Sequence, residues 1–325
     1  MKDKEVSVAP MMDWTDRHCR FLHRLLSPSA VLYTEMVTAA AILHGNKERL
    51  LGFNKQEHPV ILQLGGSEPD DLGEAAAIGT DFGYDGINLN CGCPSERVQK
   101  GAFGACLMAE PDLVAACVDG MKKRTKLPVT VKCRIGIDDH DAREMLFKFI
   151  KTVAAAGCDT FVVHARKAWL KGLSPKENRE VPPLDYALVR DLKRDTDLTI
   201  ILNGGVATAT DTLTHMDNFD GVMLGRAAYH TPEILQELHQ TIHGEAPVPL
   251  PEIVEAMIQY ADDQKARYGT PTHSVTRHMI GMHSGKRGAR AWRRILTVDS
   301  LKADNARDVL IPALAAISEG SEPVA

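Results

Sequence analysis

The sequence predicts a closed (β/α)8 TIM barrel followed by an all-helical C-terminal domain, and two observations support this α/β fold class. Eight short runs rich in Val, Ile and Leu lead into polar residues or glycines, and the gaps between them are long enough for a helix. A TIM barrel closes with eight strands that alternate with helices. The runs cover residues 6–10, 31–36, 60–66, 86–91, 129–134, 160–166, 199–205 and 221–226.

The second observation is a proline-rich break, GEAPVPLP, at residues 244–251. Its three prolines would end one helix and allow another to begin at Glu252. The four segments that follow place apolar residues at helical spacing, with no strand-like run between them. Because a barrel needs roughly 250 residues, we expect a barrel domain over residues 1–244 and a helical domain over residues 245–325.

Composition and charge narrow the class of protein. A content of 44% hydrophobic and 25% charged residues is ordinary for a globular chain, and the net charge of -5 means that any nucleic acid must bind a local basic patch. No apolar run reaches the roughly 18 residues of a transmembrane helix, and the N-terminus lacks a signal-peptide core. Seven scattered cysteines are typical of reduced thiols. Together these features predict a cytoplasmic protein.

The runs end in polar side chains that should surround one mouth of the barrel. In a TIM barrel the carboxyl ends of the strands face the active site. The residues expected there are Glu35, Gln63, Asn90, Lys132, His164, Asn203 and Arg226.

The segment after the fourth run has the densest pattern of reactive residues. Asn88 and Asn90 share one phase of an otherwise apolar strand, which predicts polar partners inside the barrel. Cys93 lies just beyond the strand in a glycine-rich loop, and a thiol that is protonated at neutral pH can act as an acid there. An isolated cysteine is more often buried packing, but this position favours catalysis. Cys91 and Cys93 have no second ligand pair at zinc spacing nearby, so we predict no metal site.

An anion site is predicted at the ends of the later strands. An inward-facing Lys132 requires a counter-charge, either a phosphate or a reduced cofactor. His164 taken alone is better explained as a core imidazole with satisfied hydrogen bonds. Asn203-Gly204-Gly205 and Gly225-Arg226 end the last two runs, where barrels commonly bind phosphate. Glycines let backbone N–H groups approach a phosphate, and Arg226 can add a forked contact.

These motifs resemble a known family in their order along nearly the whole chain. APMMDWTDRHCR (9–20), LQLGG (62–66), NLNCGCPS (88–95), GAFGACLM (101–108) and VKCRIG (131–136) are similar to those of the tRNA-dihydrouridine synthases, A subfamily. Segments 164–186, 203–206, 224–229 and 277–296 continue the resemblance. It implies an FMN-dependent enzyme that uses NADPH to reduce uridines 20 and 20a in the D-loop of tRNA. His283 and Arg287 depart from it, since the subfamily usually has an aromatic residue and a proline in that motif.

The resemblance also implies roles for individual residues. Hydride from FMN would reach C6 of the uracil while Cys93 protonates C5, with Asn90 orienting the base. Lys132 would favour the reduced flavin and Gln63 would bind the edge of its ring. The remaining cofactor contacts would come from Pro10, Met11, Met12, His164, Asn203, Gly204, Gly205, Gly225 and Arg226.

Two basic stretches are candidates for tRNA contacts, because a target uridine must leave its stack to enter a barrel mouth. The first includes Lys176 and Arg179, in the loop after the sixth run. The second is the tail stretch around Trp292, which we expect to have no acidic neighbour. It comprises Lys286, Arg287, Arg290, Arg293 and Arg294. A solvated charged face is the ordinary alternative for each stretch.

Two other functions remain open at this stage. A flavin barrel that acts on a small dihydropyrimidine such as dihydroorotate would share the loop acid or base, but it does not account for the basic tail. A tRNA-binding chaperone with a vestigial barrel would not need Cys93, Lys132 and His164.

Overall fold

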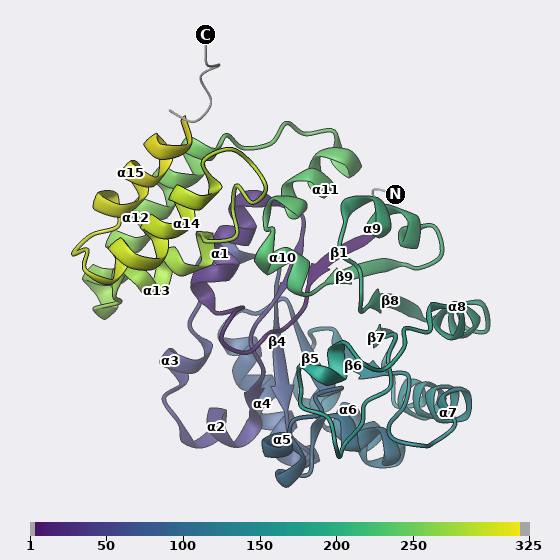
Figure 1. The fold of residues 1–325 in the computed structure, drawn as a ribbon. Helices are drawn as coiled ribbons and strands as arrows, with labels where there is room; N and C mark the ends of the chain where they lie inside the picture. Colours follow the sequence, from purple (N-terminus) through teal and green to yellow (C-terminus); the bar gives the residue numbers. More distant parts are fainter. Residues whose placement is uncertain (1–3, 319–325) are drawn as a thin grey trace. The chain divides into compact units, whose positions relative to one another are not determined.

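The structure is a computed structural model that describes residues 4–318 in two compact units. The barrel unit comprises residues 4–13 and 31–225, and the helical unit comprises residues 14–30 and 226–318. Figure 1 shows how the chain begins the barrel, contributes α1 (Arg17–Leu26) to the helical unit, and returns to the barrel. Each unit is described separately below.

Eight parallel strands close into a barrel, which confirms the predicted TIM fold. Neighbouring strands pair in the order β2-β1-β9-β8-β7-β6-β5-β4, and pairing of β2 with β4 closes the ring. A further short strand, β3 (Val37–Thr38), pairs with β4 outside the ring. The eight barrel strands are β1 Glu5–Val8, β2 Val31–Tyr33, β4 Val60–Gly65, β5 Gly86–Cys91, β6 Val129–Arg134, β7 Thr160–His164, β8 Thr199–Asn203 and β9 Gly221–Leu224.

Helices cover the outside of the barrel, and the sequence explains where the longest ones begin. Pro69 and Pro111 occupy the first positions of two helices, where a missing N–H costs nothing. Asp141 and Asp185 cap two others through their carboxylates. The helices of the barrel unit are α2 Ala39–His44, α3 Lys47–Leu51, α4 Pro69–Asp81, α5 Glu96–Lys100, α6 Pro111–Arg124, α7 Ala142–Ala155, α8 Tyr186–Arg194 and α9 Ala209–Met216, with 3₁₀ turns η1 Lys55–Glu57, η2 Gly104–Ala109 and η3 Glu177–Arg179.

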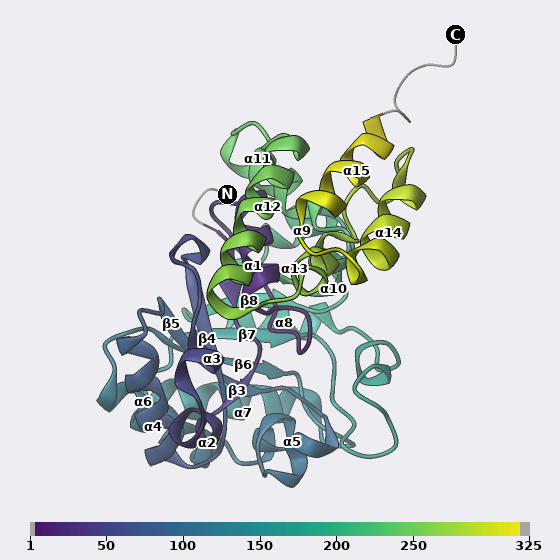
Figure 2. The same cartoon turned by 90° about the vertical axis from the view of Figure 1, so that its left-hand side faces the viewer.

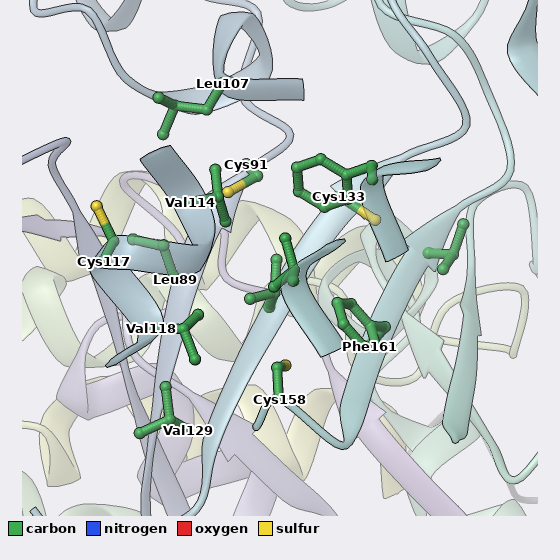
Figure 3. Close-up of a cluster of buried hydrophobic side chains, with 14 of the residues drawn as sticks. Leu89, Cys91, Leu107, Val114, Cys117, Val118, Val129, Cys133, Cys158 and Phe161 are labelled. Atoms are coloured by element: carbon green, nitrogen blue, oxygen red, sulfur yellow. The ribbon is translucent and has the colours of Figure 1, made fainter. Parts of the chain in front are cut away.

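The main apolar core lies between the outward faces of the strands and these helices. Figure 3 shows part of it, in which Leu89 and Cys91 of β5 lie near Val114 and Val118 of α6. Cys117, Cys133 and Cys158 are buried in the same core. Desolvation raises the pKa of each of these thiols, so they remain protonated and serve as packing groups. A smaller apolar cluster inside the barrel is built on Tyr33, Val162, Ile201 and Met223.

The helical unit is assembled from both ends of the chain. Asp16 caps α1 by accepting from the backbone N–H groups of His18 and Cys19, and its carboxylate also binds Arg277 at 2.7 Å and His278 at 3.0 Å. Figure 2 shows α12, α14 and α15 side by side. The other elements of this unit are α10 Arg226–His230, α11 Glu233–His243, α12 Leu250–Tyr268, α13 Thr272–Thr276, η4 Arg277–Met279, α14 Ala289–Val298, η5 Asp299–Leu301 and α15 Arg307–Ser318.

The compact units differ in extent from the predicted domains 1–244 and 245–325. They divide between residues 225 and 226, and residues 14–30 group with the C-terminal helices. The predicted break between helices is present, since α11 ends at His243 and α12 begins at Leu250, two residues before the expected start. The roles assigned to the two domains remain predictions. No helix within residues 4–318 has the length and apolar character needed to cross a bilayer.

Candidate active site

Five of the predicted mouth residues lie at the carboxyl ends of neighbouring strands. Gln63, Asn90, Lys132, His164 and Asn203 come from β4, β5, β6, β7 and β8 in turn. Asn90 is level with Lys132 in the sheet register, and His164 is level with Asn203. The barrel closure therefore brings these side chains to one end of the barrel.

The other two predicted mouth residues have different surroundings. Glu35 lies two residues beyond β2, and its carboxylate accepts a hydrogen bond from the backbone N–H of Asp13. Arg226 directly follows Gly225 and begins α10 of the helical unit.

A ladder of hydrogen bonds between buried amide side chains, Asn88, Gln63 and Asn90, runs from the barrel interior to the Cys93 loop. Asn88 Nδ2 donates to Thr130 Oγ1 at 2.9 Å, Gln63 Nε2 donates to Asn88 Oδ1 at 2.8 Å, and Asn90 Nδ2 donates to Gln63 Oε1 at 3.0 Å. Asn90 Oδ1 then accepts from the backbone N–H groups of Gly92 and Cys93, both at 3.0 Å. Because each amide is oriented by the next, the ladder fixes the start of the loop after β5.

The Cys93 loop is closed by backbone contacts as well. The carbonyl of Cys93 accepts from Ala105 N at 2.9 Å, and Gly104 makes this close approach possible. A Cβ at Gly104 would lie 2.6 Å from that carbonyl oxygen, and its φ of +80° also favours glycine. The Cys93 thiol is half-buried, with Sγ 3.6 Å from Ser95 Oγ. Cys91 is completely buried on the outer side of the strand, where desolvation raises its pKa.

Lys132 faces this site without an acidic partner. Its Nζ donates to Asn203 Oδ1 at 2.9 Å, and Asn203 Nδ2 donates to the carbonyl of Met223 at 2.8 Å. Desolvation, reinforced by the charge of Arg134, lowers the pKa of Lys132 to about 8. Among residues 4–318 no carboxylate forms an ion pair with Lys132, so the group is well suited to an anionic ligand.

His164 lies where further positive charges converge. Desolvation lowers the pKa of His164 well below its usual range, and the charges of Arg134, Lys132, Arg166 and Arg179 lower it further. The imidazole is therefore neutral at physiological pH. The charges around this neutral ring are therefore all positive among the groups that shift its pKa.

The glycines that follow β8 and β9 lack a side chain for different reasons. Gly204 has a φ of +105°, and a Cβ there would lie 2.4 Å from Cδ2 of His164. Gly205 has a φ of +75° and lies against Tyr186, whose hydroxyl donates to the carbonyl of Gly204 at 2.8 Å. Gly225 has no heavy atom of the described residues within 4 Å of its missing Cβ. Its surroundings offer space for a ligand.

The segment predicted to lie against a flavin divides between the barrel interior and solvent. Pro10 is half-buried, and Met11 packs against the apolar cluster inside the barrel. Met12 is 56% exposed, so it does not pack within the barrel unit. These three cofactor contacts remain predictions.

Arg134 is the principal site residue that sequence reasoning missed. Its side chain is 3% exposed, and it donates to the carbonyls of Gly92, Lys167 and Asn178 at 2.9, 3.0 and 2.9 Å. The signal was present, because Arg134 follows Lys132 by two residues on β6 and must face the same side of the sheet.

The predicted tRNA contacts are exposed, but their surroundings correct part of the argument for the tail. Lys176 and Arg179 lie at the surface in and beside η3, and Arg290 and Arg293 lie on the exposed side of α14. Trp292 is buried at 0% exposure, and its Nε1 donates to the carbonyl of Met279. It anchors α14 and is unavailable to RNA.

The expected absence of acidic neighbours in this tail is wrong for two of its cations. Lys286 pairs with Glu233 at 2.9 Å, and Arg294 lies 3.6 Å from Asp299. His283 adopts a φ of +61°, and its backbone N–H donates to Glu233. Its ring contacts the backbone carbonyl of Arg287, so the His283 side chain helps to shape this loop.

Alanine substitutions at Gly204 and Gly225 should have different effects on stability, because only Gly204 is closely packed. We expect Gly204→Ala to lower the free energy of unfolding by about 1–3 kcal/mol, since it combines an unfavourable φ with a clash against His164. Gly225→Ala should change it by less than about 0.5 kcal/mol, because its Cβ meets open space. Urea unfolding of both variants measures this difference, and equal stabilities would contradict it.

Comparison with known proteins gives a consistent result over almost the whole chain. The family model described as dihydrouridine synthase (Dus) matches residues 7–318. Proteins named tRNA-dihydrouridine(20/20a) synthase from Shewanella oneidensis and Vibrio parahaemolyticus are 54% and 53% identical, covering 92% and 96% of this chain and 90% and 96% of the relatives. One from Synechocystis is 51% identical over 96% of this chain and 94% of that relative. The chain therefore belongs to the dihydrouridine synthase family.

Proposed function

We propose that this protein reduces the C5–C6 double bond of uridine to 5,6-dihydrouridine at positions 20 and 20a of tRNA, with NADPH as the reductant and FMN as the cofactor. The observation that carries the proposal is the position of Cys93 in a loop held beside the buried cations Lys132 and Arg134. The names of its 51–54% identical relatives support the same substrate and positions. An enzyme acting on cellular tRNA through a thiol acid belongs in the cytoplasm, which is the location we propose.

The residues around the mouth fit FMN in charge and in space. Lys132 lacks a carboxylate partner within residues 4–318, and the surroundings of Gly225 are open. When bound, FMN supplies the two-electron chemistry that no side chain can provide. Gln63 and Lys132 would hold the ring system beside Pro10, Met11 and Met12. The phosphate would be held by His164, Asn203, Gly204, Gly205, Gly225 and Arg226.

The Asn90 side chain can hold the Cys93 loop and bind the uracil at the same time. Its oxygen holds the Cys93 loop, and one N–H binds Gln63. The second N–H has no partner among the described residues and would bind the uracil. Cys93 would donate the proton to C5 of the base, and the thiolate left behind would be stabilised by the positive charge of Lys132 and Arg134.

Removing the proposed acid should abolish most product formation. We expect Cys93→Ala to lower the rate of dihydrouridine formation by about 10²–10⁴-fold, the usual contribution of a positioned acid, while tRNA affinity is retained. Cys91→Ala is the matched control, because Cys91 is buried packing and its loss should affect stability more than turnover. Single-turnover assays with tRNA measure the rates. Near-normal turnover by Cys93→Ala would remove this residue from the mechanism.

Binding of FMN should weaken with rising pH because of Lys132. Desolvation lowers the pKa of this lysine from 10.5 to about 8 without a bound anion, and an anion beside it favours the charged form. The charged form is present below pH 8, so we expect affinity to fall by up to about tenfold per pH unit above it. Fluorescence titration of the flavin-free protein between pH 7 and 9 measures this. Lys132→Met should remove the dependence, and the exposed control Lys151→Met should retain it.

The exposed arginines of α14 should contribute to tRNA binding through phosphates. Neither Arg290 nor Arg293 forms an ion pair within residues 4–318, and both are exposed. Removing one arginine–phosphate pair should reduce the slope of log K against log salt by about 0.7–0.9. We therefore expect Arg290→Ala with Arg293→Ala to weaken tRNA binding and flatten its salt dependence.

Binding at several salt concentrations, beside a thermal melt, tests this role. The matched control is Arg143→Ala with Arg194→Ala, since these arginines both pair with Asp191 on the barrel unit. Turnover at saturating tRNA should be retained in both double variants. An unaltered salt slope for the α14 variant would exclude its two arginines from the RNA interface.

A further inference from the structure

The carbonyl groups on both sides of Cys93 are bound by side chains that also reach a second loop. Arg134 binds the carbonyl of Gly92, and it also binds those of Lys167 and Asn178. Gln99 Nε2 donates to the carbonyl of Pro94 at 2.7 Å and to that of Leu170 at 2.9 Å. Residues 92 and 94 are thus each tied to the loop of residues 165–185, which follows β7.

The 165–185 loop is itself well organised, so it can serve as a support. Asn178 is completely buried, and its side chain accepts from Trp169 N at 2.7 Å and donates to the carbonyls of Trp169, Leu173 and Ser174. Asp138 accepts from Leu170 N at 2.8 Å. The three carbonyls of the 165–185 loop that Arg134 and Gln99 bind therefore belong to a segment with its own hydrogen-bonded conformation.

Arg134 makes this connection at a considerable energetic cost. Burial disfavours its cation, and the neighbouring charges of Arg179 and Arg166 disfavour it further. None of the described carboxylates pairs with Arg134. A buried cation without an acidic partner is destabilising. A neutral hydrogen-bond donor at this position would avoid that cost, so loop stability alone does not account for an arginine. A planar group that reaches three carbonyls at once gives positional accuracy instead.

We propose that Arg134 and Gln99 are positioning residues that hold Cys93 at the correct place for proton transfer by bracing its two neighbours against the 165–185 loop. This inference rests on the proposed role of Cys93 as the acid. The same loop contains Lys176 and Arg179, the predicted tRNA contacts, so RNA docking and the placement of the acid share one support.

Kinetics of Arg134→Met, Arg134→Lys and Gln99→Ala holoenzymes with tRNA test the proposal. A displaced acid slows chemistry, so kcat should fall about 100-fold in Arg134→Met and about 5-fold to 10-fold in Gln99→Ala, with KM for tRNA within about twofold of wild type. Arg134→Lys should recover part of the activity by retaining one charged hydrogen bond. In the double variant the decrease in kcat should be smaller than the product of the two single decreases, because both residues act on one loop.

Arg24→Met is the matched control for structural damage. Arg24 is also a buried arginine that binds three carbonyls, those of Ser27, Pro28 and Ala30, but it lies in the helical unit. Both arginine variants should melt at a lower temperature. Arg24→Met should keep the wild-type kcat when measured below its melting range.

Hydrogen exchange of the substrate-free proteins provides a readout that needs no turnover. The backbone N–H groups of Gly92 and Cys93 should exchange faster in Arg134→Met and Gln99→Ala and at the wild-type rate in Arg24→Met. Unchanged exchange, or an equal decrease of kcat in Arg134→Met and Arg24→Met, would overturn the proposal. A normal kcat in Arg134→Met together with an inactive Cys93→Ala would overturn this inference alone. An active Cys93→Ala would overturn the proposed role of Cys93 as the acid, and absence of dihydrouridine formation by the wild-type enzyme would overturn the proposed function.

Discussion

The parallel closure of the barrel is the constraint on which the site depends. Every strand of the ring runs in the same direction, so all carboxyl ends meet at one mouth. Register then decides which side chains share a level: Arg134 lies opposite His164, and His164 opposite Asn203. Gln63 and Asn203, which are 140 residues apart in sequence, therefore lie at the same end of the barrel. The loops only refine what the sheet has already brought together.

Two kinds of polar group occupy this mouth, and they differ in how they are satisfied. The amides of Asn88, Gln63 and Asn90 bind one another and the backbone, so they form a rigid scaffold. The cations do not: Lys132 and Arg134 have amide or carbonyl partners, and neither has an acidic one among the described residues. Such an imbalance lowers the stability of the protein alone and is relieved by an anion. This excess of positive charge is the physical reason for proposing an anionic ligand at the site.

Much of this arrangement could be predicted from local sequence, because strands leave a strong local pattern. Residues 129–134 form a strand with the predicted bounds, and Gln63, Asn90, Lys132, His164 and Asn203 occupy the expected strand ends. What could not be predicted depends on contacts between distant segments. Arg134 reaches carbonyls 33 and 44 residues away, and Lys286 finds its acidic partner 53 residues earlier. The buried position of Trp292 likewise depends on a tertiary contact, the hydrogen bond from its Nε1 to the carbonyl of Met279, 13 residues earlier.

The discontinuous helical unit has a consequence for synthesis on the ribosome. Helix α1 is translated among the first 30 residues, but its partners begin at residue 226. At 5–20 residues per second, roughly 10–40 s pass before these partners emerge. Throughout that time the apolar face of α1, with Phe21, Leu22 and Leu26, has no native surface to cover it within its own unit. The apolar face of α1 therefore waits for its native partners of the helical unit while the barrel is synthesised, so α1 is a segment that a chaperone could protect during translation.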